Sequence, residues 1–239
     1  MKDASDNNTT PRFDRAKPVW PEGREKERNV IVGFRARFEP VGERTVFKVA
    51  GSTLYRVFLN GKFIAHGPAR GPHGWYRVDE VDLTRKVKPG RNVLAIEVAG
   101  YNVNGYYLLD QPSFLQAEVV SGKSVLAATG SAHPFEAAIL SERIQKVQRY
   151  SFQRPFSEVY RLEPGYDRWR SDLSVNMKRT RLAVQPMVNL VVRRVPFSQF
   201  KVCKPIQIVS KGSLHGVPVE KLWKDRALSD IGVKLGGYV

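Results

Sequence analysis

Aromatic and hydrogen-bonding side chains are concentrated in two short stretches of the chain, residues 67–76 and 101–110. The candidates are Arg70, His73, Trp75 and Tyr76 in the first stretch, and Tyr101, Asn102, Asn104, Tyr106 and Tyr107 in the second. Aromatic faces hold the C–H surfaces of sugars, and a few fixed polar groups hold their hydroxyls. The side chains of both stretches are therefore candidates for contact with a sugar. The alternative is that rings such as Trp75, Tyr101 and Tyr107 cap a hydrophobic core, as large aromatic side chains commonly do.

Carboxylates are the groups that could hydrolyse a sugar, since glycoside hydrolysis uses two of them across the scissile bond. The nearest cluster is Asp79, Glu80 and Asp82. Alternation along a strand points Asp79 and Val81 to one face, and Glu80 and Asp82 to the other. Asp82 stands two residues before Thr84, where an aspartate bonds the local backbone in a turn. We therefore expect structural roles for these acids and assign no catalytic residue.

Other motifs that carry chemistry are absent from the sequence. It contains neither G-x-S-x-G nor H-E-x-x-H, and its four histidines lack metal-ligand spacing. A glycine–lysine–serine run at 122–124 lacks the glycine-rich lead-in of a phosphate loop. The lone Cys203 excludes a disulfide framework and a zinc site built on several cysteines. We predict no metal site and no cofactor; a calcium ion supporting the fold is neither indicated nor excluded.

The charge balance is strongly basic. The 239 residues include 39 Lys and Arg against 23 Asp and Glu, a formal net charge of +16. No acid occurs between Asp172 and Glu220, a gap that holds eight basic residues: Lys178, Arg179, Arg181, Arg193, Arg194, Lys201, Lys204 and Lys211. This stretch is either a solvated face or a surface that meets an acidic partner. Nucleic acid is the least favoured partner, because no recognised nucleic-acid motif accompanies the charge.

Targeting signals are not visible in the sequence. No apolar run approaches the roughly 20 residues that span a membrane. Residues 1–10 are polar and lack the apolar stretch of a signal peptide. We expect a soluble chain without a membrane partner; a periplasmic or extracellular location stays open, should an export signal have been removed.

Period-two alternation of apolar residues dominates the chain from residue 29 onward. Val30, Val32, Phe34 and Ala36 alternate in one run, and the segment 93–98 alternates in another. Asn-Gly at 60–61 between two β-rich runs is a strong hairpin signal, and residues 116–127 read as a further hairpin. Closely spaced strands without helical pattern between them predict an all-β, antiparallel β-sandwich.

The pattern divides the chain into four regions. We expect a flexible tail over 1–27, a β-sandwich over 28–162 and a polar linker over 163–178. A second, smaller β-rich segment then occupies 179–239, with strands at 190–192 and 206–209 and a short helix at 219–228.

A resemblance to a known family lies mainly in residues 54–102. Its motifs are YRVFLNGK at 55–62, HG at 66–67, GWY at 74–76, DLT at 82–84 and KPGRNVLAIEV at 88–98. These motifs are common to glycoside hydrolases of the β-galactosidase type and of the α-L-rhamnosidase type. Two later runs, QRYSFQRPFSEVY at 148–160 and RRVPF at 193–197, look more like the α-L-rhamnosidase group. Together they resemble the N-terminal, galactose-binding-like jelly-roll region of bacterial α-L-rhamnosidase-like glycoside hydrolases.

The resemblance implies a supporting role rather than a reaction. In α-L-rhamnosidases the catalytic acids lie in a later barrel of paired helices, and this chain has no helical pattern long enough to form one. No residue here inherits a catalytic role. The resemblance implies a non-catalytic portion of a larger glycoside hydrolase, with a missing catalytic domain as partner and a rhamnose-containing glycan as ligand. A stand-alone carbohydrate-binding module is the alternative.

Overall fold

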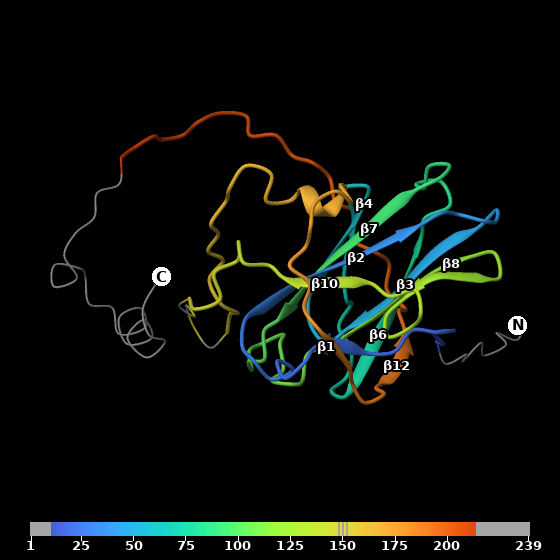
Figure 1. The fold of residues 1–239 in the computed structure, drawn as a ribbon. Coiled ribbons are helices and arrows are strands. Elements are labelled where there is room, and N and C mark those ends of the chain that lie inside the picture. The colour runs from blue at the N-terminus through green and yellow to red at the C-terminus, as the bar shows by residue number, and fades with distance from the viewer. Residues whose placement is uncertain (1–10, 148, 150, 152, 214–239) are drawn as a thin grey trace, which may run out of the picture.

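The computed structural model describes residues 11–147, 149, 151 and 153–213, and these form an all-β structure of two sheets (Figure 1). The first strands are β1 (Val19–Pro21), β2 (Val30–Phe38), β3 (Thr45–Gly51), β4 (Tyr55–Leu59), β5 (Lys62–Gly67) and β6 (Trp75–Asp82). The later strands are β7 (Asn92–Gly100), β8 (Leu115–Ser121), β9 (Ser124–Ala128), β10 (Glu136–Ile139), β11 (Leu182–Val184) and β12 (Asn189–Val192). One short 3-10 turn, η1, spans Arg168–Arg170.

The larger sheet has seven strands in the order β11-β1-β8-β3-β6-β12, with β9 also paired to β8. The smaller sheet has five strands in the order β10-β2-β7-β4-β5. Every pairing is antiparallel except that of β12 with β6, which is parallel. The predicted β-sandwich is confirmed; its assignment to the galactose-binding-like jelly-roll type stays a prediction.

The core lies between the two sheets and is filled by their alternate residues. Leu94, Ile96 and Val98 of β7 face Phe47 and Leu115 of the larger sheet in one continuous buried cluster. The remaining residues of β7 are also buried, because a second apolar cluster covers the outer face of the smaller sheet. Burial of both faces explains why β7 is apolar almost throughout.

Both predicted hairpins form. The β4–β5 hairpin turns through Asn60 and Gly61, whose φ angles are +50° and +81°. Two positive φ angles are what a tight two-residue turn between twisted strands requires, and Asn-Gly accepts them at least cost. The β8–β9 hairpin turns at Gly122, which also has a positive φ of +57°.

The prediction of a flexible tail over 1–27 is wrong for its later part. β1 lies between β11 and β8, and Trp20 is wholly buried. The buried carboxylate of Glu118 accepts hydrogen bonds from the backbone N–H groups of Asp14, Arg15 and Ala16 at 2.9–3.1 Å. These contacts join residues about a hundred positions apart, so the local sequence pattern could not indicate them.

The predicted linker over 163–178 is instead part of the sandwich. Trp169 of η1 and Met177 are buried in the cluster on the outer face of the smaller sheet, and η1 lies beside β7 (Figure 1). Gly33 makes room for the indole, since a Cβ on it would stand 2.8 Å from Trp169 Cη2. Two buried apolar side chains, Trp169 and Met177, therefore attach this otherwise polar stretch to the sandwich.

The predicted second β segment does not form a unit of its own. β11 and β12 extend the larger sheet of the sandwich. The strand expected at 206–209 is absent, and Ile206 and Val209 are 98% and 87% exposed. The helix expected at 219–228 lies outside the described residues. Within the part of the chain that the structure describes, no helix is long and apolar enough to cross a membrane.

Candidate functional site

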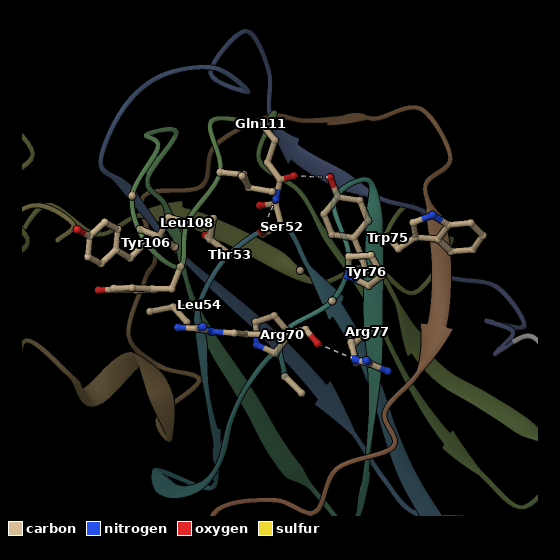
Figure 2. Close-up of a pocket in the computed structure, with 18 residues that line it drawn as sticks. Ser52, Thr53, Leu54, Arg70, Trp75, Tyr76, Arg77, Tyr106, Leu108 and Gln111 are labelled. Carbon is tan, nitrogen blue, oxygen red and sulfur yellow. Dashed lines mark hydrogen bonds between the residues drawn. The ribbon is translucent and has the colours of Figure 1, made fainter. Parts of the chain in front are cut away.

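The two predicted stretches meet at a pocket of about 400 Å³ beside the start of β6 (Figure 2). Five of the nine predicted binding residues line it: Arg70, Trp75, Tyr76, Tyr106 and Tyr107. Residues 51–54, which connect β3 to β4, form a further part of its wall. The pocket is therefore built from three connections at one end of the sandwich, where binding residues are commonly carried.

β6 supplies one aromatic wall of the pocket. Trp75 opens the strand with 46% of its surface exposed, and its indole points outward in Figure 2. Tyr76 is half-buried, with its ring edge-on to Phe114 at a centroid distance of 4.7 Å. The Tyr76 hydroxyl donates to Gln111 Oε1 at 3.1 Å, and Gln111 Nε2 donates to the backbone oxygen of Ser52 at 2.8 Å. Partial burial raises the pKa of Tyr76, so the hydroxyl stays protonated at neutral pH.

The loop between β7 and β8 supplies the opposite wall. Tyr106 and Tyr107 are 72% and 41% exposed, and the neighbouring Leu108 is buried. A backbone hydrogen bond from Gly105 N to Leu108 O, 3.0 Å long, closes this turn of the loop. The side chain of Asn104 braces it by accepting from the backbone N–H of Asp110 at 2.9 Å. Buried Leu108 anchors a turn that leaves the two tyrosines beside it at the surface.

Two arginines complete the pocket. The guanidinium of Arg70 lies over the Tyr107 ring, 5.9 Å from its centroid, within the range of a cation–π contact. Arg77, from β6, donates from Nε to the backbone oxygen of Arg70 at 2.8 Å and from Nη1 to that of Val192 at 2.8 Å. The pocket therefore has a positive character, and among the described residues that line it none is Asp or Glu.

The other four predicted residues do not line the pocket. Tyr101 and Asn102 are buried, and Asn102 Nδ2 donates to the backbone oxygens of Glu25 and Glu27 at 3.0 and 2.8 Å. Burial of Tyr101 matches the core-capping alternative for that ring, and burial raises its pKa. Asn104 is exposed and braces its loop, and His73 lies exposed in the turn before β6.

Sequence reasoning missed Ser52, Arg77 and Gln111, which also line the pocket. Ser52 and Gln111 lie 59 positions apart yet share a hydrogen bond. No spacing rule joins them. Arg77 does carry a signal, because it follows Trp75 by two positions on one strand and so shares its face.

Two of the three carboxylates singled out from the sequence have structural roles, and the third, Glu80, is exposed on β6. Asp79 is fully buried, accepts a 2.5 Å hydrogen bond from the Tyr55 hydroxyl and pairs with Arg193 at 3.1 Å. Burial first, and then the charge of Asp79, raises the pKa of Tyr55 well above its ordinary value. Asp82 Oδ1 accepts from the Thr84 N–H at 2.8 Å, as the turn pattern predicts. Among the residues with described positions, no group of three or more His, Cys, Asp or Glu could hold a metal.

The basic stretch after Asp172 is partly neutralised by acids of the sandwich. Arg179 pairs with Glu136, Arg181 with Glu22 at 3.1 Å, and Arg193 with Asp79. Lys201, Lys204 and Lys211 are exposed, as is Cys203. Beside them several apolar side chains are also exposed, namely Val195, Phe197, Phe200, Val202, Ile206, Ile208 and Val209. No ion pair in the described part of the chain includes Lys178, Lys201, Lys204 or Lys211, and the last three of these lysines lie on the segment that leaves the sandwich.

Comparison with known proteins places the fold among rhamnosidases. No protein-family model and no curated protein match the chain. The solved GH78 family rhamnosidase of Bacillus sp. GL1 is similar to it with a TM-score of 0.69 and 25% identity, over 78% of this chain and 20% of that one. The native α-L-rhamnosidase from Aspergillus terreus has a TM-score of 0.53 and 17% identity, over 73% of this chain and 21% of that one.

A third solved structure, the α-L-rhamnosidase from Dictyoglumus thermophilum, has a TM-score of 0.50 and 15% identity, over 76% of this chain and 22% of that one. The chain thus spans about a fifth of the length of these rhamnosidases. Its β-rich region is similar in fold to a β-rich part of GH78 enzymes.

Proposed function

We propose that this chain is a non-catalytic β-sandwich portion of an α-L-rhamnosidase-like glycoside hydrolase, where it supports a catalytic domain and contacts carbohydrate. The observation that carries the proposal is the similarity to the GH78 rhamnosidase of Bacillus sp. GL1, which extends over 78% of this chain but 20% of that enzyme. The motifs GWY at 74–76 and RRVPF at 193–197, which resemble those of the α-L-rhamnosidase group, support the proposal at the level of sequence.

Carbohydrate contact is proposed for the pocket between β6 and the β7–β8 loop. Trp75, Tyr106 and Tyr107 present exposed ring surface there, which suits the C–H faces of a sugar. Arg70 and the braced amide of Gln111 supply polar groups for hydroxyls. The same aromatic rings favour the second candidate, a stand-alone carbohydrate-binding module.

We do not propose that this chain hydrolyses glycosides, because no two acids among the described residues meet at the pocket. Among the described lining residues there is no carboxylate, whereas both inverting and retaining mechanisms use two. The buried acid nearest in sequence, Asp79, is occupied by Tyr55 and Arg193.

A proton NMR experiment on the chain with a synthetic α-L-rhamnoside tests the proposal. Saturation transfer to the sugar without release of free rhamnose is the expected result. Signals of free rhamnose would show that the chain is catalytic and contradict the proposal. Absence of both transfer and release would contradict contact with an α-L-rhamnoside.

The catalytic domain is proposed to meet the basic and apolar segment 193–213, since a neighbour with acidic and apolar groups would cover both kinds of exposed side chain. The chain without that neighbour should self-associate or lose solubility at low salt. Size-exclusion chromatography across a salt series checks this. A monodisperse monomer whose elution ignores salt would count against the contact.

A further inference from the structure

The charged side chains that line the pocket are all positive. Arg70 and Arg77 line it, and no acid accompanies them among the described lining residues. Neither arginine forms an ion pair with an acid in the part of the chain that the structure describes. By contrast, Arg35, Arg56, Arg143 and Arg193 elsewhere on the sandwich each pair with a carboxylate.

Arg77 is held in place without being neutralised. Its Nε and Nη1 donate at 2.8 Å to the backbone oxygens of Arg70 and Val192, which are neutral acceptors. The guanidinium is thus oriented at the pocket wall (Figure 2) while its charge stays uncompensated. An oriented guanidinium loses less entropy on binding a ligand than a free side chain does.

Arg70 stands above the Tyr107 ring and is exposed. A second hollow adjoins the pocket, shares Arg70, Tyr106 and Tyr107 with it, and adds Arg154. A glycan extending from the pocket along the two tyrosines would therefore pass a third basic side chain.

Two of the neutral polar side chains are already engaged, whereas Thr53 Oγ1 has no hydrogen-bond partner in the described part of the chain. Tyr76 donates to Gln111, and Gln111 donates to the Ser52 backbone, so this network faces the pocket with its bonds largely satisfied. Arg70 and Arg77 are the charged donors among the described residues that line the pocket, and no acid neutralises either of them there. Guanidinium groups bind carboxylates through paired, charge-assisted hydrogen bonds that are roughly twice as strong as neutral ones.

We propose that the pocket binds an acidic sugar, a uronic acid residue whose carboxylate meets Arg70 while its C–H face lies on the aromatic rings. Arg77, whose guanidinium points to the other side of the Arg70 backbone in Figure 2, adds positive charge to the pocket wall. The proposal rests on the proposed carbohydrate contact and names the class of sugar. It is also consistent with the net charge of +16, which draws anionic glycans toward the chain.

The test compares methyl β-D-glucuronide with methyl β-D-glucoside, which differ in a carboxylate against a hydroxymethyl group. Each is titrated into the isotopically labelled full chain, and pocket resonances are followed by heteronuclear NMR. We expect the glucuronide to bind about tenfold more tightly at low salt, with the advantage shrinking as salt screens the charges. Arg70→Gln should remove the advantage, whereas Arg85→Gln, at an exposed position away from the pocket lining, should keep it.

The outcomes separate this inference from the function on which it rests. Equal binding of the two glycosides, or an advantage that survives Arg70→Gln, would overturn the acidic-sugar assignment and leave carbohydrate contact standing. Binding of methyl α-L-rhamnoside without binding of the glucuronide would likewise overturn the acidic-sugar assignment and leave carbohydrate contact standing. If none of the three glycosides shifts a pocket resonance, both proposals fail.

Discussion

The ion pair between Asp79 and Arg193 should be a main attachment of the C-terminal part of the chain to the sandwich. Asp79 is fully buried, and Arg193 Nη1 contacts both of its carboxylate oxygens at 3.1 Å. Arg193 also donates to the backbone oxygens of Val195 and Pro196 at 2.7 and 2.9 Å. One side chain therefore fixes the direction in which the chain leaves β12.

Arg193→Met removes this cation and leaves the Asp79 carboxylate buried with the Tyr55 hydroxyl alone. Breaking a buried pair costs about 3–5 kcal/mol. The Arg193 side chain is 11% exposed, so water already screens part of the pair, and we expect a loss of about 3 kcal/mol in the free energy of unfolding. For a chain of this size that corresponds to a fall of about 6–12 °C in Tm.

Thermal and urea unfolding measure the change, with Arg85→Met as the matched control at an exposed position. The control should stay within about 0.5 kcal/mol of the parent chain. Combining Arg193→Met with Asp79→Asn removes both charges and should recover part of the loss, giving a coupling energy between the two sites. An Arg193→Met variant as stable as the Arg85→Met control would refute the reasoning.

Three further predictions concern contacts within the segments 11–18 and 163–178 and between these segments and the sandwich. Trp169→Ala should lower the free energy of unfolding by about 3–5 kcal/mol in a urea titration, because a buried indole is removed from the outer cluster; a cost under about 1 kcal/mol would show that 163–178 does not dock. Glu118→Gln weakens the acceptor of three backbone N–H groups, so limited proteolysis should cut residues 11–18 faster, and an unchanged rate would contradict this anchor. Ser174→Ala removes the strongest bond that lowers the pKa of Asp172 from 3.8 to about 2, so an NMR titration should show that pKa rising. Because that folded-state pKa is depressed, its stabilisation is present above about pH 4 and is lost as the pH falls toward 2. The variant should narrow this acid window without abolishing it, because Arg168 and the Ser174 backbone N–H still bond to Asp172.

Features that depend on neighbouring residues could be predicted from the sequence. The Asn60-Gly61 hairpin follows from two positive φ angles that few other residues accept. Alternation identifies β2 and β7, and the turn role of Asp82 follows from its distance of two residues to Thr84.

Features that depend on contacts with residues far away in the chain could not be predicted from the sequence. Trp20 looks like part of a polar tail until β1 is placed between β8 and β11. Trp169 looks like part of a linker until Gly33 is found to leave space for it. The alternating run at 206–209 shows the reverse error, since a strand pattern without a partner strand forms no sheet.

The candidate site also combines features that local sequence indicates with features that depend on distant contacts. Residue type alone marked both loops, and the structure brings Trp75 and Tyr106 to one pocket. It buries Tyr101 and Asn102 instead, because burial depends on what covers a residue and not on what the residue is. Ser52 and Gln111 line the pocket together because of a hydrogen bond between residues 59 positions apart, and no local sequence pattern indicates such a bond.

Fluorescence of Trp75 tests carbohydrate contact at this pocket most directly. Among the tryptophans that the structure describes, Trp20 and Trp169 are buried, whereas Trp75 is 46% exposed at the pocket, so a sugar stacked there should change the emission of Trp75. Titration with a rhamnose-containing acidic oligosaccharide should give a saturable change in the parent chain and none in Trp75→Phe. An equal change in both proteins, or no change in either, would contradict the account.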